Sequence, residues 1–228
     1  VRSTKLGVEI SAESNLALST MRNKKGGSKS FGKRDALSRI IETKVWRKMR
    51  RQKPAEFYQI RREKLVRITK TKGAKKIKAR LDMLLFLLGN GYGHEAKGVL
   101  GLIRPKSSDV AASRQFRFLQ GATDFMMGRY KDSLKALMHP SMFGNDEGEY
   151  WRAAAKIAAG EDVMNAAKTM NAKGGVFRAY PRELKMRLGI RTTEAAIIAG
   201  DIKSGIKYLS MLAKEEPRPK EIDQLAFM

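Results

Sequence analysis

The sequence contains no cysteine, which excludes disulfide bonds and thiolate-bound metals and fits the cytosol and the periplasm equally. His94 and His139 are the only histidines, and neither has another histidine or a carboxylate three or four positions further on. The longest apolar run, 83–88, is too short to cross a bilayer. Residues 1–32 hold no apolar stretch typical of a secretory signal. We therefore expect no metal, no cofactor, no transmembrane segment and no enzymatic activity.

Acidic side chains are also scarce, because 47 lysines and arginines face only 23 aspartates and glutamates, a net charge of +24. Residues 33–80 hold 19 basic and 4 acidic side chains, a net charge of +15. A charge run is usually a solvated helix face, but self-repulsion on this scale puts an anionic partner on an equal footing with that interpretation. Nucleic acid, anionic lipid and an acidic protein surface satisfy this charge equally. The residues expected to contact such a partner are Arg47, Lys48, Arg50, Arg51, Arg61, Arg62, Lys75, Lys76 and Lys78.

Residues 1–34 lack hydrophobic periodicity and predict a flexible basic linker. A basic helical segment should follow at 35–80. In it, Asp35 can cap a first helix with an apolar stripe, and Pro54 can open a second helix that Gly73 ends. The expected inward positions are Leu37, Ile40, Ile41, Val45 and Met49 in the first helix and Phe57, Ile60, Leu65 and Ile68 in the second. A buried third helix is expected from about Lys75 to Leu88.

Glycines recur between helical patterns at Gly91, Gly128, Gly160 and Gly200, at spacings of 37, 32 and 40 residues. They separate four pairs of helices: 81–89 with 94–103, 114–127 with 130–138, 147–159 with 162–170, and 181–199 with 202–213. Units of this length cannot bury their own apolar faces and usually stack into a helical solenoid. No strand-like alternation is present. We therefore predict an all-α fold with helical repeats over 81–228.

The repeat units resemble tetratricopeptide repeats. The family pattern has a small residue in the first helix, a glycine turn, an aromatic residue and a small residue in the second helix. Gly121, Gly128, Tyr130 and Ser133 match it, and Gly91 with Ala96 and Gly200 with Ile202 and Gly205 match it in part. The stretches 91–100 and 139–143 further resemble the large tetratricopeptide-repeat proteins of alphaproteobacteria. The resemblance implies a right-handed α-solenoid and a non-enzymatic scaffold for protein–protein interaction, as part of an envelope or flagellar assembly.

Other motifs have simpler explanations. Residues 89–93 are glycine-rich, but a helix precedes them where a phosphate loop needs a strand, so an inter-helix turn is favoured. Asp146, Glu147 and Glu149 lie at an expected helix start, where carboxylates interact well with the helix dipole. Twelve methionines could form an adaptable groove, although core packing is the more ordinary role.

The leading hypothesis is an adaptor that binds a protein or peptide in a solenoid groove and docks an acidic surface on its basic segment. First helices should line the groove, and helix phase suggests exposed contact residues at Arg117, Asp124, Arg152, Lys156 and Arg191. The alternative is a nucleic-acid-binding protein that uses 33–80, with Trp46, Phe57 and Tyr58 stacking on bases. An enzyme with helical repeats, such as a cell-wall lytic enzyme, is disfavoured because no catalytic set is visible. We also expect the chain to be a piece of a longer repeat protein, since 219–228 reads as an unpartnered helix start.

Overall fold

The computed structural model describes residues 3–4, 7–8, 37–50, 56–103 and 113–215. The chain divides into two compact units, Val1–Ala36 and Leu37–Met228. In the first unit, the short strands β1 (Ser3–Thr4) and β2 (Gly7–Val8) pair antiparallel. The rest of the predicted linker, the predicted cap Asp35, and Pro54 lie outside the described residues.

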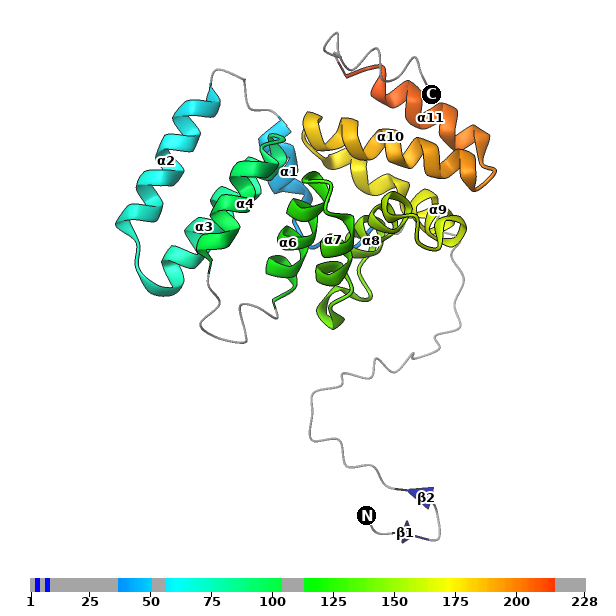
Figure 1. Ribbon diagram of the computed structural model, residues 1–228, viewed down its shortest axis with the longest axis horizontal. Helices are drawn as coiled ribbons and strands as arrows, with labels where there is room; N and C mark the ends of the chain where they lie inside the picture. The colour runs from blue at the N-terminus through cyan, green and yellow to red at the C-terminus, as the bar shows by residue number, and fades with distance from the viewer. Residues whose placement is uncertain (1–2, 5–6, 9–36, 51–55, 104–112, 216–228) are drawn as a thin grey trace, which may run out of the picture. The chain divides into compact units, whose positions relative to one another are not determined.

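Every regular element described in the second unit is helical (Figure 1). The helices at its N-terminal end are α1 (Thr43–Arg50) and α2 (Phe57–Lys70). The four hairpins that follow are α3 (Gly73–Gly89) with α4 (Gly93–Leu102), α6 (Arg114–Met126) with α7 (Tyr130–Leu137), α8 (Asp146–Ala159) with α9 (Val163–Ala172), and α10 (Arg182–Ile198) with α11 (Ile202–Leu212). The short 3₁₀ helices are η2 (Pro140–Met142) and η3 (Gly174–Ala179). The predicted helical class and all four helix pairings are confirmed.

The repeat glycines lie at the hairpin turns, as the sequence predicted. Gly91, Gly128, Gly160 and Gly200 have φ angles of 82°, 72°, 74° and 79°, in the left-handed region that side chains disfavour. Just before the second turn, Gly121 lets α6 and α7 approach closely, because a Cβ there would lie 2.5 Å from Leu137 Cγ. Ser133 Oγ donates to Gly121 O at 2.8 Å across the same contact.

Replacing Gly128 with valine should lower the free energy of unfolding by about 1 kcal/mol or more. A Cβ at this position would meet nothing within 4 Å, so the cost comes from the positive φ and not from a clash. The measurement is urea denaturation followed by circular dichroism. Gly98→Val is the matched control, because Gly98 lies in α4 with ordinary φ and equally open surroundings. Equal stabilities for the two variants would contradict a strained turn at Gly128.

Successive hairpins pack on one another, α4 with α6, α7 with α8, and α9 with α10. In addition, α10 of the fourth hairpin contacts α3 of the first hairpin. There, a Cβ at Gly89 would lie 3.4 Å from the Pro181 ring. The core runs through all four hairpins and includes the fully buried rings of Phe118, Trp151 and Tyr180.

The N-terminal helical segment differs from the sequence prediction in three respects. Residues 37–42 are not helical, and α1 begins only at Thr43. Gly73 begins α3 and does not end α2, whose C-cap is Thr71. Leu65 was expected to point inward, but 42% of its surface is exposed, because α2 packs mainly against α3 and buries no residue completely.

Candidate partner-binding surface

The first turn of α8 holds the chain's own N-terminal segment. Glu147 is fully buried, and its Oε2 accepts hydrogen bonds from the backbone N–H groups of Ile40 (2.8 Å) and Ile41 (2.9 Å). Its Oε1 accepts from Trp46 Nε1 (3.1 Å) and from the Tyr180 hydroxyl (2.8 Å). Because Glu147 takes up these two N–H groups, they are not available for a helix at residues 37–42. This is the physical reason why α1 starts late.

Asp146 extends the same junction. Its Oδ2 accepts from the backbone N–H of Ser38 at 2.7 Å and from the Ser38 hydroxyl at 2.9 Å, and Lys173 pairs with its other oxygen. The first-turn carboxylates therefore do more than interact with the helix dipole, the only role that the sequence indicated. They join segments about 100 residues apart in sequence.

Burial dominates the electrostatics around Glu147. It raises the pKa of the Glu147 carboxyl, while the donors from Ile41 and Tyr180 and the charge of Arg39 oppose the shift. Burial also raises the pKa of Tyr180 well above its ordinary value. The Arg39 guanidinium lies 3.9 Å from Glu147 Oε1 and donates to the carbonyl of Val176. Glu147 thus has four donors and one nearby cation, which makes it a structural link between segments.

The five predicted groove residues do not form one surface. Asp124 and Arg152 are buried, which corrects the expectation that they are exposed. Asp124 pairs with Lys97 at 2.5 Å, and the Arg152 guanidinium lies 4.4 Å from the centre of the Phe143 ring. Asp124 lies in α6 and Arg152 in α8, and neighbouring hairpins cover both helices on several sides. The helical spacing of residues alone therefore could not identify a solvent-exposed face.

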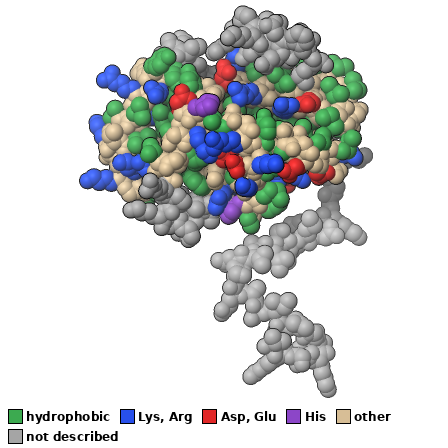
Figure 2. Space-filling model, in the orientation of Figure 1, with side chains coloured by type: hydrophobic (Ala, Val, Ile, Leu, Met, Phe, Trp, Pro, Cys, Tyr) green, Lys and Arg blue, Asp and Glu red, His purple; other side chains and the backbone are tan. Residues whose placement is uncertain are grey.

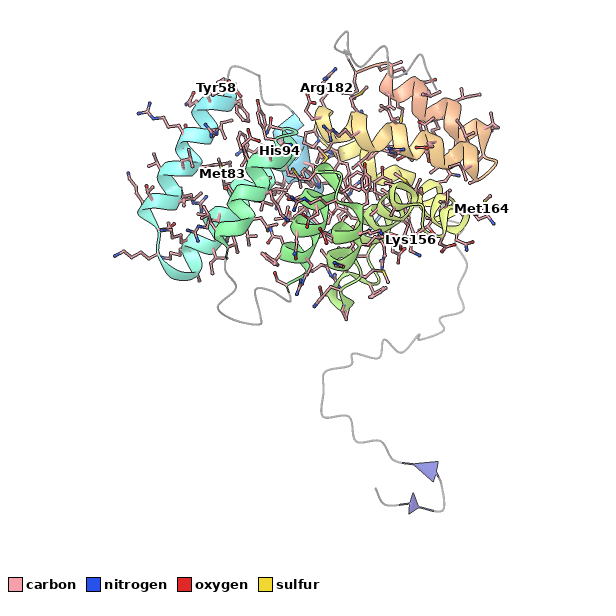
Figure 3. All side chains as sticks on the ribbon, in the orientation of Figure 1. Tyr58, Met83, His94, Lys156, Met164 and Arg182 are labelled. Carbon is pink, nitrogen blue, oxygen red and sulfur yellow. The ribbon has the colours of Figure 1, made fainter. Side chains whose placement is uncertain are left out.

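The other three groove residues keep local partners. Arg117 donates to Gln120 at 3.2 Å, Lys156 (Figure 3) pairs with Asp162 at 3.3 Å, and Arg191 pairs with Glu194 at 2.7 Å. Lys156 and Arg152 line a cavity of about 120 Å³ between α8 and α9. Arg191 instead lines a separate groove of about 750 Å³ between α10 and the α6–α7 turn.

We call this second cavity, of about 750 Å³, the α6–α10 groove. Its apolar lining comes from Phe125, Met126, Tyr130, Met186 and Ile190. Its charged lining comes from Glu183, Arg187, Arg191 and Glu194. It lies between α6, the start of α7 and α10, and its charged lining is balanced, with two cations and two carboxylates.

The predicted anion-binding residues lie on three elements. Arg47 and Lys48 are exposed on α1, Arg61 and Arg62 on α2, and Lys75 and Lys78 on α3, where Lys76 is half-buried. None of these seven forms an ion pair with an acidic side chain of the described residues, and Figure 2 shows basic side chains protruding on the side of α2 and α3. The Arg50 side chain and all of Arg51 lie outside the described residues.

The outer side of α2 combines these cations with apolar surface. Tyr58, near the start of α2 (Figure 3), is 73% exposed, and Leu65 and Val66 are 42% and 41% exposed. Tyr58, Arg62 and Leu65 follow the i, i+4, i+7 spacing that places residues on one helix face. The opposite face of α2 meets α3, where Phe57 stacks on Phe86 with ring centres 5.1 Å apart. We call this outer side, with Arg61 and Val66, the α2 face.

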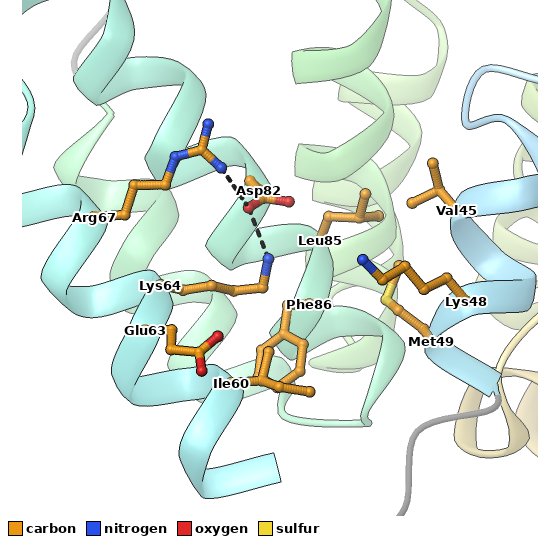
Figure 4. Close-up of a pocket in the computed structure, with 10 residues that line it drawn as sticks. All are labelled: Val45, Lys48, Met49, Ile60, Glu63, Lys64, Arg67, Asp82, Leu85 and Phe86. Atoms are coloured by element: carbon orange, nitrogen blue, oxygen red, sulfur yellow. Dashed lines mark hydrogen bonds and ion pairs between the residues drawn. The ribbon is translucent and has the colours of Figure 1, made fainter. Parts of the chain in front are cut away.

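A cavity of about 350 Å³ lies between α1, α2 and α3 (Figure 4), and we call it the α1–α3 cavity. Its apolar lining is Val45, Met49, Ile60, Leu85 and Phe86. Its charged lining is Lys48, Glu63, Lys64, Arg67 and Asp82. The sequence did not predict this cavity, because the spacing of residues within one helix does not indicate how three helices pack together.

Metal and membrane sites are not found in the described parts of the chain. No three histidine, aspartate or glutamate side chains among them come close enough together to hold a metal ion. None of the described helices is long and apolar enough to span a bilayer.

A scan against protein-family models and searches of curated proteins and solved structures found no match.

Proposed function

We propose that the protein is a non-enzymatic adaptor whose stacked hairpins form a right-handed, tetratricopeptide-like solenoid. Its cationic end, the α2 face with the neighbouring cations of α1 and α3, docks an acidic protein surface. The observation that carries this proposal is the α2 face itself. There, Tyr58, Leu65 and Val66 are exposed beside Arg61 and Arg62, which have no acidic partner among the described residues.

Exposed apolar and cationic groups on one helix face are complementary to a partner that supplies both apolar and acidic groups. Interfaces of this kind use charge to steer association and apolar side chains to hold the complex. An isolated cationic helix face would need only solvent, whereas three exposed apolar residues on the same helix are better explained by a partner.

The α6–α10 groove supports the peptide-binding part of the hypothesis. It is open, it is large enough for several side chains, and aromatic and methionine side chains line it beside charged ones. The fold already holds a non-helical segment elsewhere, since Asp146 and Glu147 bind residues 38–41 through backbone and side-chain groups. The groove would accept a peptide without net charge, distinct from the acidic partner of the α2 face.

A nucleic-acid-binding function remains the second candidate, because one observation favours it. Tyr58 is the most exposed of the aromatic side chains described, and it lies on α2 within one helical turn of Arg61 and Arg62. An exposed ring beside arginines is a common platform for stacking on single-stranded bases.

The proposal is tested with a fluorescently labelled 15-residue helical peptide rich in glutamate, which stands in for an acidic partner. We expect wild-type protein to bind it at low salt and Arg61→Gln/Arg62→Gln to bind it about tenfold more weakly. The measurement is fluorescence anisotropy. The control Lys203→Gln/Lys207→Gln removes two equally exposed charges from α11 and should change affinity less than about twofold. Equal losses in both variants would show that binding follows net charge and not the α2 face.

A further inference from the structure

The α1–α3 cavity has an apolar floor that the Lys64 side chain partly covers, since its Nζ lies 5.6 Å from the centre of the Phe86 ring. Phe86 and Leu85 are buried from the protein exterior at its base, and Ile60, Met49 and Val45 complete the walls from α2 and α1. Its volume of about 350 Å³ falls within the range of sites that accept ligands, about 300–1,000 Å³. An apolar group that entered it would leave water and contact three helices at once.

The charged rim of the cavity is not balanced. Asp82 Oδ2 accepts a hydrogen bond from Lys64 Nζ at 2.7 Å and lies 3.8 Å from the Arg67 guanidinium, so one carboxylate is paired with two cations. Glu63, whose Oε1 accepts from Gln59 at 3.1 Å, contributes a second carboxylate, and Lys48 contributes a third cation that forms no ion pair with a described acid. Figure 4 shows its ammonium group extending from α1 toward the middle of the cavity, on the side opposite α2. The rim thus offers one free positive charge next to an apolar recess.

We infer that the α1–α3 cavity receives one large apolar side chain of the acidic partner, and that Lys48 pairs with a carboxylate beside that side chain. This inference rests on the proposed function and adds the chemistry of the partner: an acidic helix with an apolar anchor residue. Interfaces of this kind concentrate their binding energy in a few large side chains that fill pockets. Helical ligands present such anchors together with charged neighbours at i+3 or i+4.

A protein partner fits the surroundings of the cavity better than a free amphiphile does. The cavity adjoins α2, whose other residues include exposed arginines without described acidic partners and exposed apolar groups that a small ligand would not reach. A second copy of the chain fits poorly, because the chain carries a net charge of +24. The exposed helix at the other end of the array, α11, also presents Lys203 and Lys207.

The test compares two labelled 15-residue acidic helical peptides that differ only in a central residue, phenylalanine or serine. Wild-type protein should bind the phenylalanine peptide about tenfold more tightly than the serine peptide. Val45→Phe, which fills the cavity without removing charge, should abolish that preference. Lys48→Gln should weaken binding of the phenylalanine peptide. Lys44→Gln, on the same helix but 79% exposed and outside the cavity lining, should leave it unchanged.

The possible outcomes distinguish failure of the anchor in the α1–α3 cavity from failure of acidic docking on the α2 face. Equal binding of the two peptides overturns the anchor and leaves acidic docking in place. A preference for phenylalanine that persists in Val45→Phe places the anchor elsewhere and also overturns the inference. Absence of binding by either peptide at 50 mM salt overturns the proposed function as well. Laurate binding in the cavity without peptide binding would assign it to a free amphiphile. Lys48→Gln changes an exposed side chain, so its result stands even where Val45→Phe fails to fold.

Discussion

Replacing Glu147 with glutamine is expected to lower the free energy of unfolding by about 3–5 kcal/mol. The carboxylate accepts from two backbone N–H groups on one oxygen and from Trp46 and Tyr180 on the other. A glutamine amide would place its NH₂ group against one of these donor pairs in either orientation. Buried donors would then lose their acceptor, and Arg39 would lose its neighbouring negative charge.

Urea denaturation measures this loss, and Glu149→Gln provides the matched control. Glu149 lies in the same first turn of α8, but its side chain is 36% exposed and it pairs with Lys173 at 3.6 Å. Its replacement should cost no more than about 1 kcal/mol. Both carboxylates lie in the first turn of α8, close to the positive end of the helix dipole. A small loss of stability of similar size in the two variants would therefore mean that dipole stabilisation explains both. A large effect at Glu147 alone would show that this residue holds the N-terminal segment in place.

Much of the fold could be predicted because its signals are local. A glycine between two apolar helical patterns marks a left-handed turn, and Gly128 and Gly160 both have the expected positive φ. The small residues at Gly121 and Ser133 indicated close helix contact, and both lie in the α6–α7 interface. Right-handed stacking depends on how each hairpin meets the next, and it stays a prediction.

The junction at the start of α8 could not be predicted for the opposite reason. Nothing in the sequence around Glu147 distinguishes a carboxylate at a solvated helix end from one that binds Ile40 and Ile41. The contacts that bring these segments together, such as the packing of Trp46 on Tyr180 with ring centres 5.1 Å apart, join residues far apart in sequence. The late start of α1 follows from this contact and was therefore missed as well.

The prediction of the groove residues was wrong for a related reason. Residues 121–126 of α6 and 150–155 of α8 are buried without interruption, so these helices have no free stripe in those turns. When a helix is covered on all sides, the spacing of its residues does not identify an exposed face. The expectation that Asp124 and Arg152 are exposed is wrong for this reason. The cationic residues were placed more successfully, because the cost of burying unpaired lysine and arginine keeps them exposed.

We expect a 20-base-pair DNA duplex to bind only weakly at physiological salt, with Kd no tighter than about 10⁻⁶ M. Contacts with about five phosphates would give a log–log salt slope near −4.5, so affinity would fall about 500-fold between 50 and 200 mM salt. The variant to test replaces Arg47, Arg50, Arg51, Arg61 and Arg62 with glutamine. It should flatten the slope and also fail to capture the acidic peptide. Anisotropy titrations at several salt concentrations measure both.

The matched control replaces five exposed lysines of other helices, Lys131, Lys135, Lys168, Lys203 and Lys207, with glutamine. Both variants lose the same net charge, so only a local surface can separate them. A steep slope that survives in the control and disappears in the arginine variant would locate anion binding at α1 and α2. Sub-micromolar duplex or single-strand binding at physiological salt, lost with the five arginines, would make nucleic acid the partner. Weak nucleic-acid binding with peptide capture that depends on the same arginines would favour an acidic protein over nucleic acid at the cationic end, because a protein, unlike a duplex, supplies apolar side chains for Leu65 and Val66.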